Sequence, residues 1–94
     1  MGSGKDEVER ALGRSIRIRI LAALGMEPTT WQTAYSLGKR IGVKNPRVRE
    51  NLKRLIRIGW VEEAGNSPRS YRLNPSSRRG QLFQEFLKKS DYWD

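Results

Sequence analysis

The sequence predicts a small α+β domain that is mainly helical, and three observations carry this prediction. Its 94 residues suffice for one domain with a single modest core. Apolar residues recur at helical spacing in four segments, which are bounded by glycine, proline or capping residues. Two short β-prone runs flank a polar, glycine-containing tip, a pattern typical of a hairpin. The predicted order is therefore three helices, a two-stranded hairpin and a C-terminal helix.

The first helix is expected over residues 6–24, and Gly25 is expected to end it. Ile18 and Leu21 point away from its main apolar face, so a second apolar surface needs another element to cover it. The main face consists of Leu12, Ile16, Ile20, Ala23 and Leu24.

A second helix is expected to begin at a cap formed by Thr29 or Thr30 and to end at Gly42. Gly38 lies inside this helix, where glycine costs roughly 1 kcal/mol relative to alanine. We therefore expect another helix to approach closely at that point. The shared apolar face consists of Trp31, Ala34, Leu37, Gly38 and Ile41.

A third helix is expected to start at Asn45, whose side chain is predicted to cap it, with Pro46 as its first helical residue and Gly59 as its stop. Its outward face is strongly basic, because residues 44–57 contain six cations and one anion. This short segment holds five of the nine net positive charges. The inward stripe consists of Val48, Leu52, Leu55 and Ile56.

The hairpin is expected to pair residues 60–64 with residues 70–73 across a five-residue tip. Tyr71 should face inward and Arg72 outward, because side chains alternate along a strand. Residues 74–77 break the chain and can cap a final helix. The apolar side of that helix needs a partner and consists of Leu82, Phe83, Phe86 and Leu87.

Composition narrows the possible functions. The net charge is +9, and 13 of the 19 cations are arginine, whose planar guanidinium matches phosphate oxygens and guanine edges. The absence of Cys and His removes thiol nucleophiles, imidazole bases and most zinc sites. No phosphate-binding loop or catalytic constellation is found, so we expect neither an enzyme nor a metal nor a cofactor. The longest apolar run is too short to cross a bilayer, which favours a cytoplasmic, nucleoid-associated protein.

The joint between the second and third helices has about the length of the turn in a helix-turn-helix motif. The run KNPRVRENLKRL at 44–55 and the step GWV at 59–61 resemble the recognition-helix pattern of winged helix-turn-helix regulators, particularly the ArsR-like group. RIRIL at 17–21 resembles an early helix of that family, and RSYRLNP at 69–75 resembles its second wing strand. The resemblance implies a winged helix-turn-helix fold, α+β and mainly α, in a DNA-binding transcriptional regulator. Metal sensing is not implied, because metal-sensing members use Cys and His ligands.

The resemblance, together with the capping signals, predicts how the chain is divided. Residues 1–5 are expected to form a flexible leader, residues 6–75 the winged-helix DNA-binding domain, and residues 76–94 a C-terminal helix that packs or dimerises. That helix and the spare face of the first helix can satisfy each other within one chain or across a twofold axis, and we predict a homodimer. The predicted dimerisation residues are Ile18, Leu21, Leu82, Phe83, Phe86 and Leu87.

Double-stranded DNA is the predicted partner, with a recognition helix over about 45–58 in the major groove and a wing over about 61–73 beside it. The candidates for base edges are Arg47, Arg49, Asn51 and Arg54. Those for the backbone and the helix start are Lys44, Asn45 and Lys53. At the wing tip the candidates are Asn66, Ser67 and Arg69, which either enter the minor groove or follow the backbone.

Other interpretations remain open at this level. A basic face would also suit a chromatin-organising protein, a winged-helix module that docks on an acidic protein, or an RNA-binding protein. Trp31, Trp60 and Tyr71 are expected in the core rather than as stacking platforms for single strands. The abundance of arginine and the absence of cysteine would suit a thermophilic, archaeal source.

Overall fold

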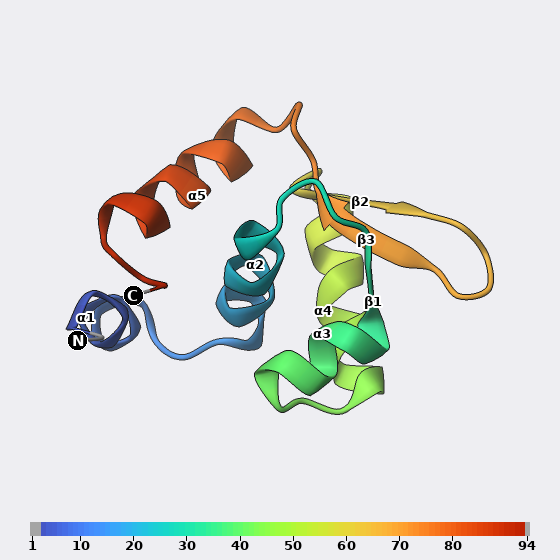
Figure 1. Ribbon diagram of the computed structural model, residues 1–94, viewed down its shortest axis with the longest axis horizontal. Helices are drawn as coiled ribbons and strands as arrows, with labels where there is room; N and C mark the ends of the chain where they lie inside the picture. Colours follow the sequence, from blue (N-terminus) through green and yellow to red (C-terminus); the bar gives the residue numbers. More distant parts are fainter. Residues whose placement is uncertain (1–2, 94) are drawn as a thin grey trace.

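The computed structural model describes residues 3–93, which form five helices and a three-stranded antiparallel sheet. In Figure 1, α2 lies at the centre, with α3, α4 and the sheet on one side and α1 and α5 on the other. The elements in chain order are α1 (Ser3–Leu12), α2 (Ile16–Met26), β1 (Gln32–Thr33), α3 (Ala34–Ile41), α4 (Asn45–Arg57), β2 (Val61–Ala64), β3 (Ser70–Leu73) and α5 (Arg78–Lys89).

The first predicted helix is two helices. Gly13 has a φ of 83°, a left-handed conformation that ends α1. Ser15 then caps α2, because its hydroxyl accepts a hydrogen bond from the Ile18 amide at 3.1 Å. The prediction of one helix over residues 6–24 was therefore wrong. It extended one apolar stripe across Gly13, whose left-handed conformation ends the helix.

Two predicted boundaries of this region also change. Residues 3–5, predicted as part of the flexible leader, begin α1, while Met1 and Gly2 lie outside the described residues. Gly25 does not end α2, which continues to Met26. A Cβ atom on Gly25 would clash with Oε1 of Gln84 and lie 2.9 Å from the Trp93 ring. Gly25 thus makes room for α5 and the C-terminal segment instead of stopping the helix.

The second predicted helix starts later than expected. Thr33, not Thr29 or Thr30, caps α3 by accepting a hydrogen bond from the Ser36 amide at 3.1 Å. The two residues of β1 pair with β3, so the sheet has the order β1-β3-β2 and a third strand that the sequence did not predict. Trp31 precedes this strand and is 39% exposed, so its predicted place in the core was wrong.

The joint between α3 and α4 follows the prediction in outline. Gly42 ends α3 with a φ of 71°, as predicted. Gly38 does have a close neighbour, but it is the Val43 carbonyl of the turn, 2.6 Å from where a Cβ would lie, and not another helix as predicted. A side chain of α4, Val48, follows at 3.4 Å. The cap of α4 is the backbone of Lys44 with no side-chain bond, which corrects the predicted Asn45 cap.

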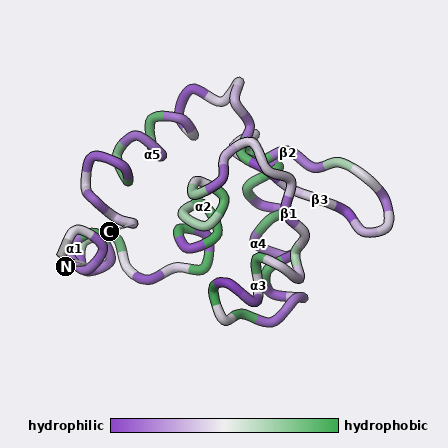
Figure 2. Tube along the Cα trace, viewed as in Figure 1, coloured by the Kyte–Doolittle hydropathy of each residue, from purple (hydrophilic) through white to green (hydrophobic). Residues whose placement is uncertain are grey.

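The core lies where α2, α3, α4 and the inner face of the sheet meet. Val48, Leu52 and Leu55 are buried as predicted, and Tyr71 and Leu73 face inward from β3, each 5% exposed. Figure 2 shows hydrophobic segments on α2 and α4, with hydrophilic colour over much of the wing. The main cluster consists of Ile20, Leu21, Ala23, Leu24, Ala34, Leu37, Ile41, Val48, Leu52, Leu55, Val61, Tyr71 and Leu73.

The C-terminal helix packs against α2 in the same chain. Leu87 is fully buried in a second cluster with Val8, Ala22 and Tyr92. Phe83 lies 5.9 Å from the ring of Trp60. Leu87 and Phe83 therefore find partners within the chain, whereas Leu82 and Phe86 stay exposed. Among residues 3–93, no helix is long and apolar enough to span a bilayer.

Candidate nucleic-acid interface

The predicted recognition residues lie on the outer face of α4 and in the turn before it. The helix forms because its apolar residues recur on one face, and that face packs against α2 and α3. The opposite face is left to the polar residues. Lys44, Arg47, Arg49, Lys53 and Arg54 are exposed, while Asn45 and Asn51 are half-buried.

The cations of this face are electrostatically uncompensated. Within the part of the chain that the structure describes, no carboxylate lies within ion-pair distance of any of the six. Glu50, the single anion of α4, also forms no ion pair there. The positive charge of the helix is thus available to an external anion. The six cations are Lys44, Arg47, Arg49, Lys53, Arg54 and Arg57.

The two asparagines of α4 are already engaged within the helix. The Asn51 side-chain amide donates to the Arg47 carbonyl at 2.8 Å, and the Asn45 side chain accepts from Nε of Arg49 at 3.2 Å. A bidentate contact of Asn51 with adenine uses the side-chain oxygen and one of the two N–H donors, so the other N–H can keep its bond to the Arg47 carbonyl. Arg54 makes no such side-chain bond within the described residues and can reach outward directly.

The hairpin places the three predicted wing residues, Asn66, Ser67 and Arg69, in exposed positions at or beside its tip. Its two arginines are both paired across the strands: Arg69 with Glu63 at 3.0 Å and Arg72 with Glu62 at 2.8 Å. Residues 61–73 carry two glutamates and two arginines, so the wing has no net charge. The wing and α4 therefore present very different electrostatic surfaces.

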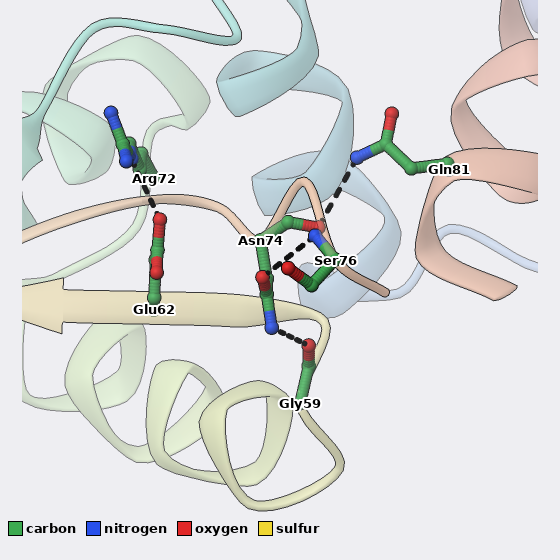
Figure 3. A network of polar contacts seen from close by, with 6 residues as sticks. All are labelled: Gly59, Glu62, Arg72, Asn74, Ser76 and Gln81. Carbon is green, nitrogen blue, oxygen red and sulfur yellow. Dashed lines mark hydrogen bonds and ion pairs between the residues drawn. The ribbon is translucent and has the colours of Figure 1, made fainter. Parts of the chain in front are cut away.

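One residue that the sequence did not single out for function fixes the wing to the rest of the fold. Asn74 donates from its side chain to the Gly59 carbonyl at 2.8 Å and accepts from the Ser76 amide at 2.9 Å (Figure 3). Gln81 of α5 donates to the Asn74 carbonyl at 3.2 Å. The Asn-Pro step after a strand predicts the local turn to Ser76. The bond to Gly59 joins positions 15 residues apart and exists only in the folded chain.

The fold brings α4 and the wing to the same side of the molecule, away from α1 and α5 (Figure 1). Only residues 58–60 separate α4 from β2, and β2 packs against the helix. The short connection gives the hairpin little freedom relative to α4. Residues 3–93 contain no group of three or more His, Cys, Asp or Glu side chains that could hold a metal ion.

No protein-family model matches the sequence, and no curated protein matches it in sequence. Solved structures do match in fold. MepR, a transcription regulator of the Staphylococcus aureus multidrug efflux pump MepA, superposes with a TM-score of 0.69 at 16% identity over 96% of this chain and 67% of MepR. MarR from E. coli in its reduced form gives 0.68 at 19% identity over 99% of this chain and 68% of MarR. Reduced HlyU from Vibrio cholerae gives 0.66 at 19% identity over 93% and 87%.

This is the winged-helix fold. The predicted fold class is thereby confirmed, with a first helix split in two and a third strand added. In the winged helix, α3 and α4 form the helix-turn-helix, and β2 and β3 form the wing. The chain spans about two thirds of the length of MepR and of MarR. A MepR variant has also been solved bound to an oligodeoxyribonucleotide.

Proposed function

We propose that this protein binds double-stranded DNA, with α4 in the major groove and the wing beside it, and acts as a transcriptional regulator. The observation that carries this proposal is the exposed face of α4, where six cations lie without a carboxylate partner among the described residues. An α-helix fits the width of the major groove, and cations along it neutralise phosphates and release counterions.

The cations of α4 and of the turn before it are suited to different parts of the DNA. Arg47 and Arg54 are exposed, and their guanidinium groups make no contact with a carboxylate in the described chain, so they are the main candidates for guanine edges. Lys44 and Lys53 suit phosphates, which position the protein without reading sequence. Asn51 and Arg49 can join them while they keep their bonds within the helix, because each of those bonds uses only one N–H donor of the side chain.

The role as a regulator is supported by likeness of fold to MepR, which is a transcription regulator. Membership of the ArsR-like group, an archaeal source, association with the nucleoid and the homodimer all stay predictions. The proposal is therefore made for a winged-helix DNA-binding regulator without a subgroup.

The test is a fluorescence-anisotropy titration of a mixed-sequence duplex over a series of salt concentrations. Lys44→Ala with Lys53→Ala should lose at least tenfold in affinity and lower the salt slope of log K by about 1.8, because each phosphate contact contributes roughly 0.9. The control is Arg10→Ala with Lys88→Ala, which removes the same charge from exposed positions on α1 and α5 and should bind as wild type does.

Three outcomes would contradict the proposal. Equal losses in both double variants would mean that net charge, not α4, attracts the duplex. An absence of binding at low salt would exclude duplex DNA as the partner. Stronger binding to an RNA hairpin than to the duplex would favour RNA recognition by shape.

A further inference from the structure

We propose that Glu63 restrains the wing's contact with DNA, because it holds Arg69 in an ion pair that a phosphate must displace. The inference rests on the proposed function, and it makes Glu63 a residue that lowers the affinity of the wing. Arg69 then engages DNA only by exchanging one anionic partner for another. The wing would therefore add less to binding than its two arginines suggest.

The geometry of the tip supports such an exchange. Nη1 of Arg69 lies 3.0 Å from Oε1 of Glu63, and the two side chains are 54% and 36% exposed. In the register of the hairpin, Glu63 lies opposite Tyr71 and Ala64 opposite Ser70, so Arg69 just precedes the paired region. Both partners stand in solvent at the end of the wing. A phosphate can reach the guanidinium without any change in the core.

The second ion pair of the wing differs in its surroundings. Arg72 pairs with Glu62 at 2.8 Å, and its guanidinium also lies 4.4 Å from the centre of the Trp31 ring. A carboxylate and an indole from two different segments hold this arginine, and its side chain is 32% exposed. Arg72 therefore ties the hairpin to the segment before α3. Of the two, Arg69 is the arginine placed to exchange partners.

The proposal predicts a small gain in affinity for DNA when Glu63 is replaced. The cations of α4 have no carboxylate partner among the described residues, so they can bind phosphates directly. Arg69 must first leave Glu63. Exposed ion pairs shift equilibria by roughly 1.5- to fivefold. Glu63→Gln should therefore bind duplex DNA about two- to fivefold more tightly, with a salt slope steeper by about 0.9.

The experiment measures binding of a mixed-sequence duplex to four variants. They are Glu63→Gln, Glu62→Gln, Arg69→Gln, and Glu63→Gln combined with Arg69→Gln. Glu62→Gln is the matched control, because it makes the same change in net charge at the adjacent position. We expect the gain in Glu63→Gln, little change in Glu62→Gln, and no gain from Glu63→Gln once Arg69 is replaced.

Equal gains from Glu62→Gln and Glu63→Gln would overturn the proposal, because net charge alone would then explain them. A gain that persists without Arg69 would overturn it as well. If wild type binds duplex through α4 and Glu63→Gln changes nothing, this inference fails while the proposed function stands. If no variant binds duplex, both fail.

A measurement without DNA tests the pair itself. The ¹⁵N Nε–H signal of Arg69 should shift in Glu63→Gln and stay in place in Glu62→Gln, because only the first variant removes its partner. An unchanged Arg69 signal in Glu63→Gln would mean that the pair does not form in solution. That result would overturn the proposal whatever the DNA titrations show.

Discussion

Tyr92 is a buried titratable group near the C-terminus, and its pKa depends on folding. It is 5% exposed, and its hydroxyl donates to Oε2 of Glu9 at 3.1 Å. Burial, and then the hydrogen bond to Glu9 and its charge, raise the pKa of Tyr92 from 10.0 to about 12. Tyr92 thereby links the C-terminal segment to α1, and it does so only while it keeps its proton.

This raised pKa predicts a loss of stability at high pH. The unfolded chain releases the Tyr92 proton near pH 10, whereas the folded chain keeps it until about pH 12. The stabilisation is therefore complete below pH 10 and falls by about 1.4 kcal/mol per pH unit between these values. Tyr92→Phe should lose less stability over the same interval, as measured by urea unfolding at pH 8 and pH 11.

Tyr35→Phe is the control for this experiment, because Tyr35 is 64% exposed. It should follow the wild-type curve, since exposed substitutions are usually worth less than about 0.5 kcal/mol. An alkaline loss of the same size in wild type and Tyr92→Phe would show that other groups control stability there.

At the scale of elements, the joint between α3 and α4 determines how the recognition helix is presented. The amides of Gly42 and Val43 both donate to the Gly38 carbonyl, at 2.8 and 3.0 Å. The turn thus folds back over the last turn of α3, where Gly38 has no side chain to obstruct it. The guanidinium of Arg19 on α2 also donates to the Ile41 carbonyl near the end of α3.

Gly38→Ala should therefore destabilise the protein although alanine favours helices. The added methyl group would lie 2.6 Å from the Val43 carbonyl, a backbone atom that cannot swing aside. We expect a net loss of about 1–3 kcal/mol in urea unfolding, because overpacking outweighs the gain in helix propensity. Lys39→Ala, an exposed change in the same helix, should stay within about 0.5 kcal/mol. Unchanged or higher stability of Gly38→Ala would mean that the turn relaxes freely.

At the scale of the whole molecule, intrachain packing reduces the surface available to a second copy. Of the predicted dimerisation residues, Leu21 and Leu87 are 4% and 0% exposed, and Ile18 and Phe83 are half-buried. Leu82 and Phe86 remain on the outer side of α5, 54% and 44% exposed. A homodimer built on α5 would therefore use these two side chains.

This prediction is checked by sedimentation over a range of protein concentrations. Wild type should approach the mass of a dimer, and Leu82→Glu with Phe86→Glu should remain a folded monomer, because charges would be buried at the interface. Ile58→Glu is the control, since Ile58 is 61% exposed and follows α4 rather than lying on α5. A wild-type mass that stays that of a monomer at every concentration would exclude the homodimer.

The sequence alone determined the features that depend on neighbouring residues. The buried stripe Val48, Leu52 and Leu55 follows from helical spacing, and Gly42 and Gly59 end their helices with φ of 71° and 82°. The hairpin was predictable for the same reason, since alternation and a polar tip are local properties. The basic face of α4 also followed, because a helix whose apolar stripe is buried must expose the remaining residues.

The tertiary structure alone decided what depends on residues distant in the chain. Two residues become β1 because β3 offers them a partner, and Gly25 leaves the space beside α2 to Gln84 and Trp93. The pair of Arg69 with Glu63 likewise requires the register of the hairpin. In each case the stabilising contact comes from a segment that is distant in the sequence. Local propensity reflects only neighbouring residues, so these contacts could not be predicted before the chain was seen folded.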